Sequence, residues 1–155
     1  MSKIDETNRL ILNILQKDGA ITNAELAKRI GLAPASTLER VKKLEKTGII
    51  KKYVALADSE KIGKGITAFV EISMNDHSAE TIKRFNHDII KIPEVLECYH
   101  ISGDKDYLLK VATDSIKNYE VVALEKLAVI PHVGKISTLF VLSTIKSETA
   151  IYLNN

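Results

Sequence analysis

The sequence has a single cysteine and no long apolar run, and these absences exclude several classes of protein. Cys98 has no second cysteine with which to form an intramolecular disulfide, as is typical of a reducing cytosol. No apolar stretch approaches the roughly 20 residues that a membrane-spanning helix needs, and the charged first residues do not resemble a signal peptide. We therefore expect a cytoplasmic protein without a membrane partner.

Motifs for catalysis, metal binding and nucleotide binding are also missing. His100 lies two residues from Cys98, but no residue is identified as the matched base that a catalytic thiol requires. There is no glycine-rich phosphate-binding loop. The four histidines lack a cysteine partner or an H-x-x-H spacing, so no metal site is expected. We predict a protein that is not an enzyme and has no cofactor.

Charge is distributed unevenly along the chain. Residues 1–57 contain 11 Lys or Arg and 6 Asp or Glu, a net charge of +5, whereas the remaining residues contain 11 and 14, a net charge of −3. A basic first third suggests a module that binds a polyanion, attached to one that does not. A chance fluctuation is the alternative if charge is considered alone.

The most informative stretch predicts a helix-turn-helix. Thr22-Asn23-Ala24-Glu25 has the Ser/Thr-x-x-Glu spacing of a capping box, which begins a helix. Gly31 supplies the left-handed residue that ends this helix, and Pro34 suits the first position of a second helix that runs to Thr47. Two short helices joined by a tight turn are typical of a DNA reader, with the reading unit at about residues 24–43.

Flanking signals complete a predicted DNA-binding domain over residues 1–57. Asp5 caps a first helix whose expected apolar stripe includes Leu10 and Ile11. The alternating, β-branched stretch Ile49–Leu56 predicts a strand, which would form the wing. Residues 58–65, with two glycines and several charges, predict a linker.

Residues 66–155 show strand and helix patterns in the order βαββαβ, an α+β fold of the ferredoxin-like kind with helices on one sheet face. The expected elements are strand Ile66–Met74, a helix from Ser78 to about Lys91, strands Val95–Ile101 and Tyr107–Ala112, a helix after Ser115, and strand Val133–Ile145. Both faces of the last strand are apolar, and an uncovered apolar sheet face exceeds what monomers usually expose. We therefore infer dimerisation through the sheet.

The second helix of the reader presents several polar candidates to double-stranded DNA. Ser36 and Arg40 are the predicted base contacts, because Arg is a common bidentate reader of guanine. Glu39 either accepts from a cytosine amino group or pairs with the lysine four residues on. Lys42, Lys43 and Lys46 are expected to contact phosphates.

Two threonines complete the set of candidate DNA contacts. Thr22 is a candidate phosphate contact, although helix capping alone explains it and is the favoured interpretation. Thr37 is included as well, with either Thr37 or Leu38 expected to face the core. A merely solvated, charged helix face is the alternative for the whole set.

These fragments together resemble the Lrp/AsnC family of leucine-responsive and asparagine-responsive transcriptional regulators. The resemblance runs from Ile4 to about Ile151, and its fragments are Glu25-Leu26-Ala27, Gly31-Leu32-Ala33-Pro34, Arg40–Glu45, Gly48-Ile49-Ile50, Gly103–Val111 and Ile130–Val133. It implies a winged helix-turn-helix, an effector domain, dimers that assemble into tetramers or octamers, and amino acids bound between dimers. It further implies regulation of amino-acid metabolism on a prokaryotic nucleoid.

The family's G-x-x-D-Y loop places the candidate effector site. The candidate residues are Gly103, Asp104, Asp106, Tyr107 and Thr138, with loop N–H groups for a carboxylate and an Asp for an ammonium. An ordinary hairpin explains Gly and Asp equally well without the family context. Lys105 and Ile136 depart from the family pattern at this site, and Ala33 replaces the Ser that usually caps the reading helix.

Two other functions stay open at this point. One is a DNA-binding architectural regulator of the same fold without an effector, which the departures at Lys105 and Ile136 leave open. The other is an amino-acid-binding regulatory subunit of a metabolic enzyme, which predicts no salt-dependent binding to DNA.

Overall fold

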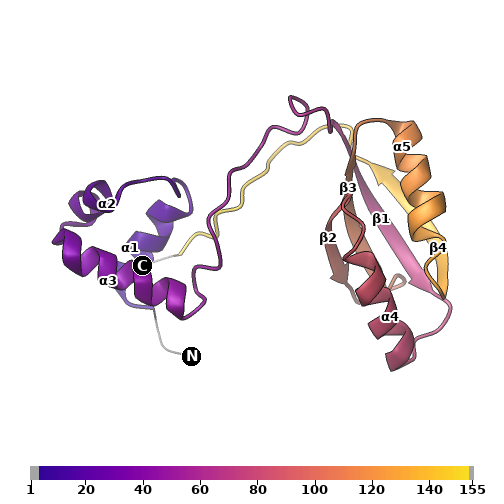
Figure 1. The fold of residues 1–155 in the computed structure, drawn as a ribbon, viewed down its shortest axis with the longest axis horizontal. Coiled ribbons are helices and arrows are strands. Elements are labelled where there is room, and N and C mark those ends of the chain that lie inside the picture. Colours follow the sequence, from indigo (N-terminus) through magenta and orange to yellow (C-terminus); the bar gives the residue numbers. More distant parts are fainter. Residues whose placement is uncertain (1–3, 154–155) are drawn as a thin grey trace. The chain divides into compact units, whose positions relative to one another are not determined.

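The computed structural model describes residues 4–153, and the chain forms two compact units (Figure 1). The first unit contains the chain up to Leu56 together with the segment from Lys146 onward, and the second is Ala57–Ile145. The predicted second domain, 66–155, therefore differs from the structure in its last residues, because these pack on the first unit. Residues 1–3 and 154–155 of the predicted domains lie outside the described residues.

The first unit is built on three short helices, α1 (Glu6–Leu15), α2 (Asn23–Ile30) and α3 (Pro34–Lys46). Asp5 caps α1 as predicted, because its Oδ1 accepts from the Asn8 N–H at 2.7 Å. The helices pack around a small core of Ile11, Leu12, Leu26 and Leu44. Leu10, expected in the core, is instead 39% exposed, and Leu12 takes that place.

The strand predicted for Ile49–Leu56 is wrong, because the structure assigns none to these residues. The N–H groups of Ile49 and Ile50 both donate to the Leu44 carbonyl, at 3.0 and 3.1 Å, and so turn the chain at the end of α3. A strand requires a neighbouring strand for its backbone hydrogen bonds, and no described segment pairs with this stretch.

The second unit is a four-stranded antiparallel sheet with the order β2-β3-β1-β4. This order and the βαββαβ sequence confirm the predicted ferredoxin-like arrangement. The elements are β1 (Ile66–Met74), α4 (Ala79–Ile89), β2 (Val95–His100), β3 (Tyr107–Thr113), α5 (Ile116–Val121), the π-helical turn η1 (Val122–Leu127) and β4 (Val133–Phe140).

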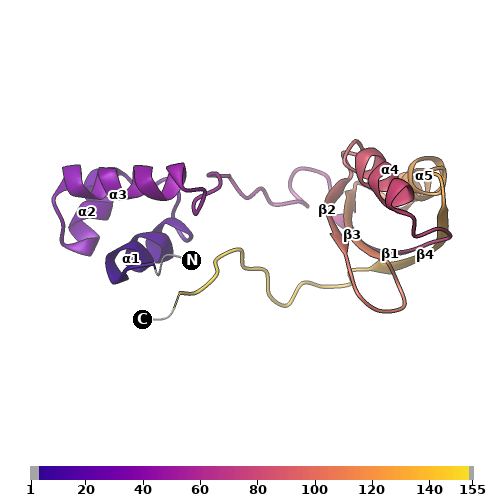
Figure 2. The ribbon, with the colours of Figure 1, turned by 90° about the horizontal axis from the view of Figure 1, so that it is seen from below.

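Helices α4 and α5 lie on one face of the sheet (Figure 2). The core consists of residues from these elements, from η1 and from the strands. Alternation along β1 explains the layering, because Ala68, Val70 and Ile72 are fully buried while their neighbours are half-buried. Phe85 from α4 and Leu127 from η1 complete this core. The final strand is shorter than predicted, ending at Phe140 instead of Ile145.

The other sheet face has no helix over it and carries an apolar strip. Phe69 is paired with Leu139 on β4, and Leu108 on β3 is paired with Tyr99 on β2. Leu139 and Tyr99 are 54% and 50% exposed. These four residues form a diagonal apolar strip flanked by Glu71, Lys110 and Glu97. Such a strip is consistent with the expected sheet-to-sheet contact.

Candidate nucleic-acid interface and effector loop

The helix-turn-helix is held together by local hydrogen bonds. Thr22 Oγ1 accepts from the Glu25 N–H at 3.2 Å. Thr22 therefore caps α2, the role that the sequence favoured over a phosphate contact. The Glu25 carboxylate accepts from Arg29 Nε at 3.1 Å, and the reciprocal half of the capping box is not seen among residues 4–153. Gly31 adopts the left-handed conformation at φ 70°, as expected.

A long-range contact sets the start of the reading helix. Asn23 Nδ2 donates to the Pro34 carbonyl at 2.8 Å and thereby ties the first turn of α2 to that of α3. Pro34 occupies the first helical position, and Ala33 makes no side-chain cap. Pro fixes a helical φ there without losing a bond, so α3 begins at its predicted residue despite the missing cap.

The outward side of α3 presents most of the predicted DNA contacts to solvent. Ser36, Glu39, Lys42, Lys43 and Lys46 are all exposed. The opposite side of α3 faces the other helices of the first unit, here called the head, because Thr37 and Leu44 are buried. None of the three lysines has an ion-pair partner within the described part of the chain. Their charges are therefore available to a polyanion.

The prediction that Thr37 contacts DNA is contradicted by its burial. Its side chain is fully buried, and its hydroxyl donates to the Ala33 carbonyl at 3.1 Å. Leu38, the alternative core residue, is 42% exposed. The sequence did not distinguish the two because neighbouring helical residues differ by only 100° around the axis. Thr37 packs α3 on the head.

Arg40, predicted to reach base edges, is engaged within the head. Its Nη1 donates to Asp5 Oδ2 at 2.8 Å and to Asn8 Oδ1 at 3.1 Å. The Arg40 hydrogen bond is the main cause of a lowered pKa at Asp5, followed by the Asn8 N–H. Arg40 therefore links α3 to the capped start of α1. The sequence signals for the cap and for the reading helix are both local, and neither predicts a pair 35 residues apart.

The candidate effector loop joins β2 to β3 and is closed by the Ile101 N–H, which donates to the Asp106 carbonyl at 2.9 Å. Gly103 has φ 125°, a conformation that favours glycine. Asp104 is exposed at the loop tip. These two residues keep the accessibility that a ligand contact requires.

Both carboxylate oxygens of Asp106 are occupied by the chain itself. Oδ2 accepts from the Met74 N–H at 2.7 Å, and Oδ1 lies 2.9 Å from His77 Nε2. The Met74 N–H is the main cause of a lowered pKa at Asp106; partial burial opposes it, and His77 reinforces it. Asp106 therefore fixes the loop to the end of β1. An ammonium group would have to share these oxygens with Met74 and His77.

Tyr107 and Thr138 lie on the helix-facing side of the sheet. Tyr107 is 2% exposed, and its ring centroid lies 4.2 Å from that of Phe85 and 5.0 Å from that of His100. Thr138 is hydrogen-bonded through its hydroxyl to Tyr119. Because β1 lies between β3 and β4, the structure separates these two residues. Four well-formed cavities among residues 4–153 are lined by other residues and not by the predicted effector residues.

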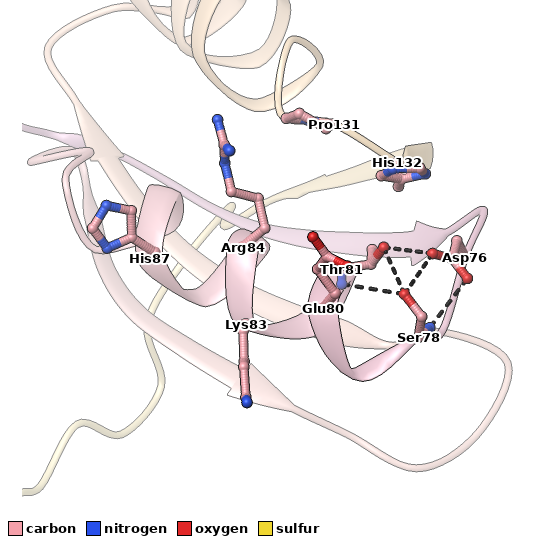
Figure 3. Close-up of a pocket in the computed structure, with 9 residues that line it drawn as sticks. All are labelled: Asp76, Ser78, Glu80, Thr81, Lys83, Arg84, His87, Pro131 and His132. Atoms are coloured by element: carbon pink, nitrogen blue, oxygen red, sulfur yellow. Dashed lines mark hydrogen bonds between the residues drawn. The ribbon is translucent and has the colours of Figure 1, made fainter.

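The structure has a cavity of about 590 Å³ at the start of α4, which was not predicted from the sequence (Figure 3). Asp76 is one of its lining residues, and its carboxylate accepts from the Ser78 N–H at 3.1 Å, from Ser78 Oγ at 2.7 Å and from Thr81 Oγ1 at 2.5 Å. The hydroxyls of Thr81 and Ser78 lower the pKa of Asp76 to about 2. Ser78 caps α4 by accepting from the Thr81 N–H, and the network holds Asp76 beside this cap.

Other candidate chemistry is absent from the part of the chain that the structure describes. No three His, Cys, Asp or Glu residues among residues 4–153 are grouped to hold a metal ion. Burial raises the pKa of Cys98 to about 11, so the thiol stays protonated at neutral pH. None of the described helices has the length and apolar character needed to cross a bilayer.

Comparison with known proteins agrees with both halves of this architecture. Residues 67–151 match the family model of the Lrp/AsnC ligand-binding domain, and residues 4–51 match that of a winged helix-turn-helix DNA-binding domain. The chain is 38% identical over 148 residues to the transcriptional regulator AzlB of Bacillus subtilis, which covers 96% of this chain and 94% of that protein.

Two further proteins extend the likeness. The chain is 38% identical over 150 residues to the leucine-responsive regulatory protein of Escherichia coli, with 97% and 92% coverage. A transcriptional regulator from Neisseria meningitidis, solved in complex with L-methionine, has a TM-score of 0.94 at 34% identity and 98% coverage of both chains. With its DNA-binding and ligand-binding domains, the chain belongs to the Lrp/AsnC family of transcriptional regulators.

Proposed function

We propose that this regulator reads DNA with the outward side of α3 and responds to an amino acid of the methionine class. The observation that carries the DNA proposal is the exposed polar and basic side of α3, with Ser36 and Glu39 toward base edges and Lys42, Lys43 and Lys46 toward phosphates. Thr22 and Arg40 support this surface by capping and cross-linking the helices. Like its relatives, the protein then acts as a regulator and not as an enzyme.

The L-methionine bound by the regulator from Neisseria meningitidis supports the effector class. Gly103 and Asp104 are the proposed contacts, since they are the accessible members of the predicted set. Tyr107, Thr138 and Asp106 then shape the site without being free to bind in one chain. We propose that a second dimer completes the site, and that the apolar sheet strip forms each dimer in the cytoplasm.

Binding to duplex DNA from upstream of the protein's own gene tests both parts of the proposal. We expect binding that weakens with salt, because each phosphate contact contributes about −0.9 to the slope of log affinity against log salt. Three lysines on each of two heads give a slope of about −5, and Lys42→Ala reduces its magnitude by about 1 per head. A slope near zero contradicts the DNA proposal.

The effector is tested by repeating the titration with L-methionine and then with the other amino acids. A shift in DNA affinity or in oligomer size supports the proposed class, and Asp104→Ala is expected to remove it without changing unliganded DNA binding. The second candidate function, an architectural regulator without an effector, is favoured by the occupied oxygens of Asp106. It predicts DNA binding that no amino acid changes.

A further inference from the structure

The C-terminal residues Thr149–Leu153, here called the tail segment, are held by two side-chain amides, those of Asn13 in α1 and of Gln16 at its C-cap. Gln16 Nε2 donates to the Ile151 carbonyl at 2.9 Å, and the Ile151 N–H donates back to Gln16 Oε1 at 2.7 Å. Asn13 makes the same pair of bonds with Leu153, at 3.1 and 3.2 Å. Four hydrogen bonds thus join two side chains to the backbone of two residues.

The spacing of these residues matches a helix to an extended chain. Asn13 and Gln16 are three apart and lie on one side of α1, while Ile151 and Leu153 are two apart and lie on one side of an extended segment. Each amide offers one donor and one acceptor, as the edge of a β-strand does. The first unit therefore carries a surface that binds an extended peptide through its backbone.

Apolar contacts accompany the amide bonds. Leu153 packs against the core of the first unit. A cavity of about 450 Å³ is lined on one side by Thr149, Ile151 and Leu153, and on the other by residues that include Leu15 and Tyr53. Of these residues, Leu153 packs on the first unit, whereas Ile151 keeps an exposed side chain and is held through its backbone.

The docking is weak enough to be reversible. Ile151 and Tyr152 are 73% and 76% exposed, and Leu153 is only partly buried. A segment with few buried apolar contacts and accessible hydrogen bonds opens at low free-energy cost. The tail segment can therefore be released without unfolding the three helices.

We infer that the tail segment is a releasable strap that limits the freedom of the DNA-binding unit. The chain enters the second unit through residues 57–65 before β1 and leaves it after β4, and these strands are neighbours in the sheet. With the tail segment docked, the DNA-binding unit is attached to the second unit by two chain segments. Building on the proposed reading by two heads, the strap lowers the entropy cost of placing both heads on one site.

Full-length variants test this inference. Asn13→Ala/Gln16→Ala removes the clamps from α1, and Leu153→Asp removes the apolar anchor from the tail side. Asn86→Ala, at an exposed asparagine of α4, is the matched control. Hydrogen exchange followed by mass spectrometry reports on the tail segment, on residues 57–65 and on α1–α3, whose retained protection shows that the head stays folded.

We expect the tail segment to exchange at least tenfold faster in both test variants and at the wild-type rate in the control. Affinity for a duplex with two half-sites, selected from a random pool with the wild type, should fall at least threefold. Affinity for the same duplex with one half-site scrambled should stay within twofold. If the double variant unfolds the head, Leu153→Asp decides the result.

Two results overturn the strap. One is exchange of the wild-type tail segment at the rate of a free chain, and the other is a released tail segment with unchanged two-site affinity. A wild type that binds no DNA contradicts the proposed function instead. In that case, hydrogen exchange of residues 57–65 tests the strap. If the strap exists, these residues must exchange faster in the variants that release the tail segment.

Discussion

Arg40 is expected to act on the stability of the DNA-binding unit and not on base recognition. Arg40→Met keeps the apolar stem and removes the guanidinium that donates to Asp5 and Asn8. The Arg40 and Asp5 side chains are 36% and 53% exposed, so solvent screening limits the ion pair to about 0–1 kcal/mol. With the Asn8 contact, we expect the free energy of unfolding of this unit to fall by about 1 kcal/mol.

The measurement is thermal unfolding followed by circular dichroism at 222 nm. For a unit of this size, about 1 kcal/mol corresponds to a fall in Tm of about 4–8 °C. Asp5→Ala should cost more, because it also removes a helix cap worth about 1 kcal/mol. The double variant measures the coupling between the two side chains. Its loss of stability should be smaller than the sum of the losses in the two single variants.

The pH dependence supplies a second check on the same pair. Because the pKa of Asp5 is lowered in the folded protein, its contribution to stability is present above the ordinary pKa of about 3.9 and is lost as the pH falls through the lowered value. Arg40→Met should raise the pKa of Asp5 and make the loss of stability in acid smaller. Carboxyl NMR shifts report that pKa directly.

DNA binding distinguishes this account from base recognition. Lys42→Met, at an exposed position of the same helix, serves as the control, and it should weaken binding to all sequences with little change in Tm. Arg40→Met, measured well below its Tm, should keep the wild-type sequence preference. An unchanged Tm together with a lost preference for the selected site refutes the reasoning.

Three further changes have directions that the structure fixes. Ala33→Ser supplies the missing cap of α3 and should stabilise the first unit by about 0.5–1 kcal/mol, seen as a higher Tm. Gly134→Ala places a Cβ 2.9 Å from the Ser73 carbonyl oxygen, a backbone atom, and should destabilise the second unit by about 1–3 kcal/mol, whereas Gly65→Ala, with only ordinary contacts, should not. Thr81→Val removes the main donor to Asp76 and should raise the pKa of Asp76 from about 2. The variant should then lose less stability than the wild type between about pH 4 and pH 2. An unchanged titration of the Asp76 carboxyl contradicts this.

Local signals predicted most of the fold. The caps at Asp5, Thr22, Ser78 and Ser115 each accept the hydrogen bond that their residue type predicts. Caps and alternating apolar residues depend on neighbours a few positions away, and such patterns are visible in one sequence. The sequence of elements, βαββαβ, was predicted in the same way, whereas the order of the strands within the sheet comes from the structure.

Contacts between distant residues were beyond the same signals. The wing strand failed because Ile49–Leu56 has a strand's composition but no described strand beside it. The tail segment was assigned to the second domain because nothing in its own composition shows that Asn13 and Gln16 bind it. Arg40 has a helix position suited to DNA, and only the fold reveals Asp5 beside it.

In the proposed effector site, Asp106 positions the loop and does not touch the ligand. A carboxylate that accepts from the Met74 N–H and contacts His77 holds the end of the loop against β1, and so fixes where Gly103 and Asp104 lie. Asp106→Asn retains one acceptor oxygen for Met74 but places an amide at the other position. If Asp106 positions the loop, this variant should weaken amino-acid binding less than Asp106→Ala, because the loop keeps half of its anchor. If Asp106 instead binds an ammonium through its charge, both variants should lose binding equally, and a calorimetric titration of the two with L-methionine separates these roles.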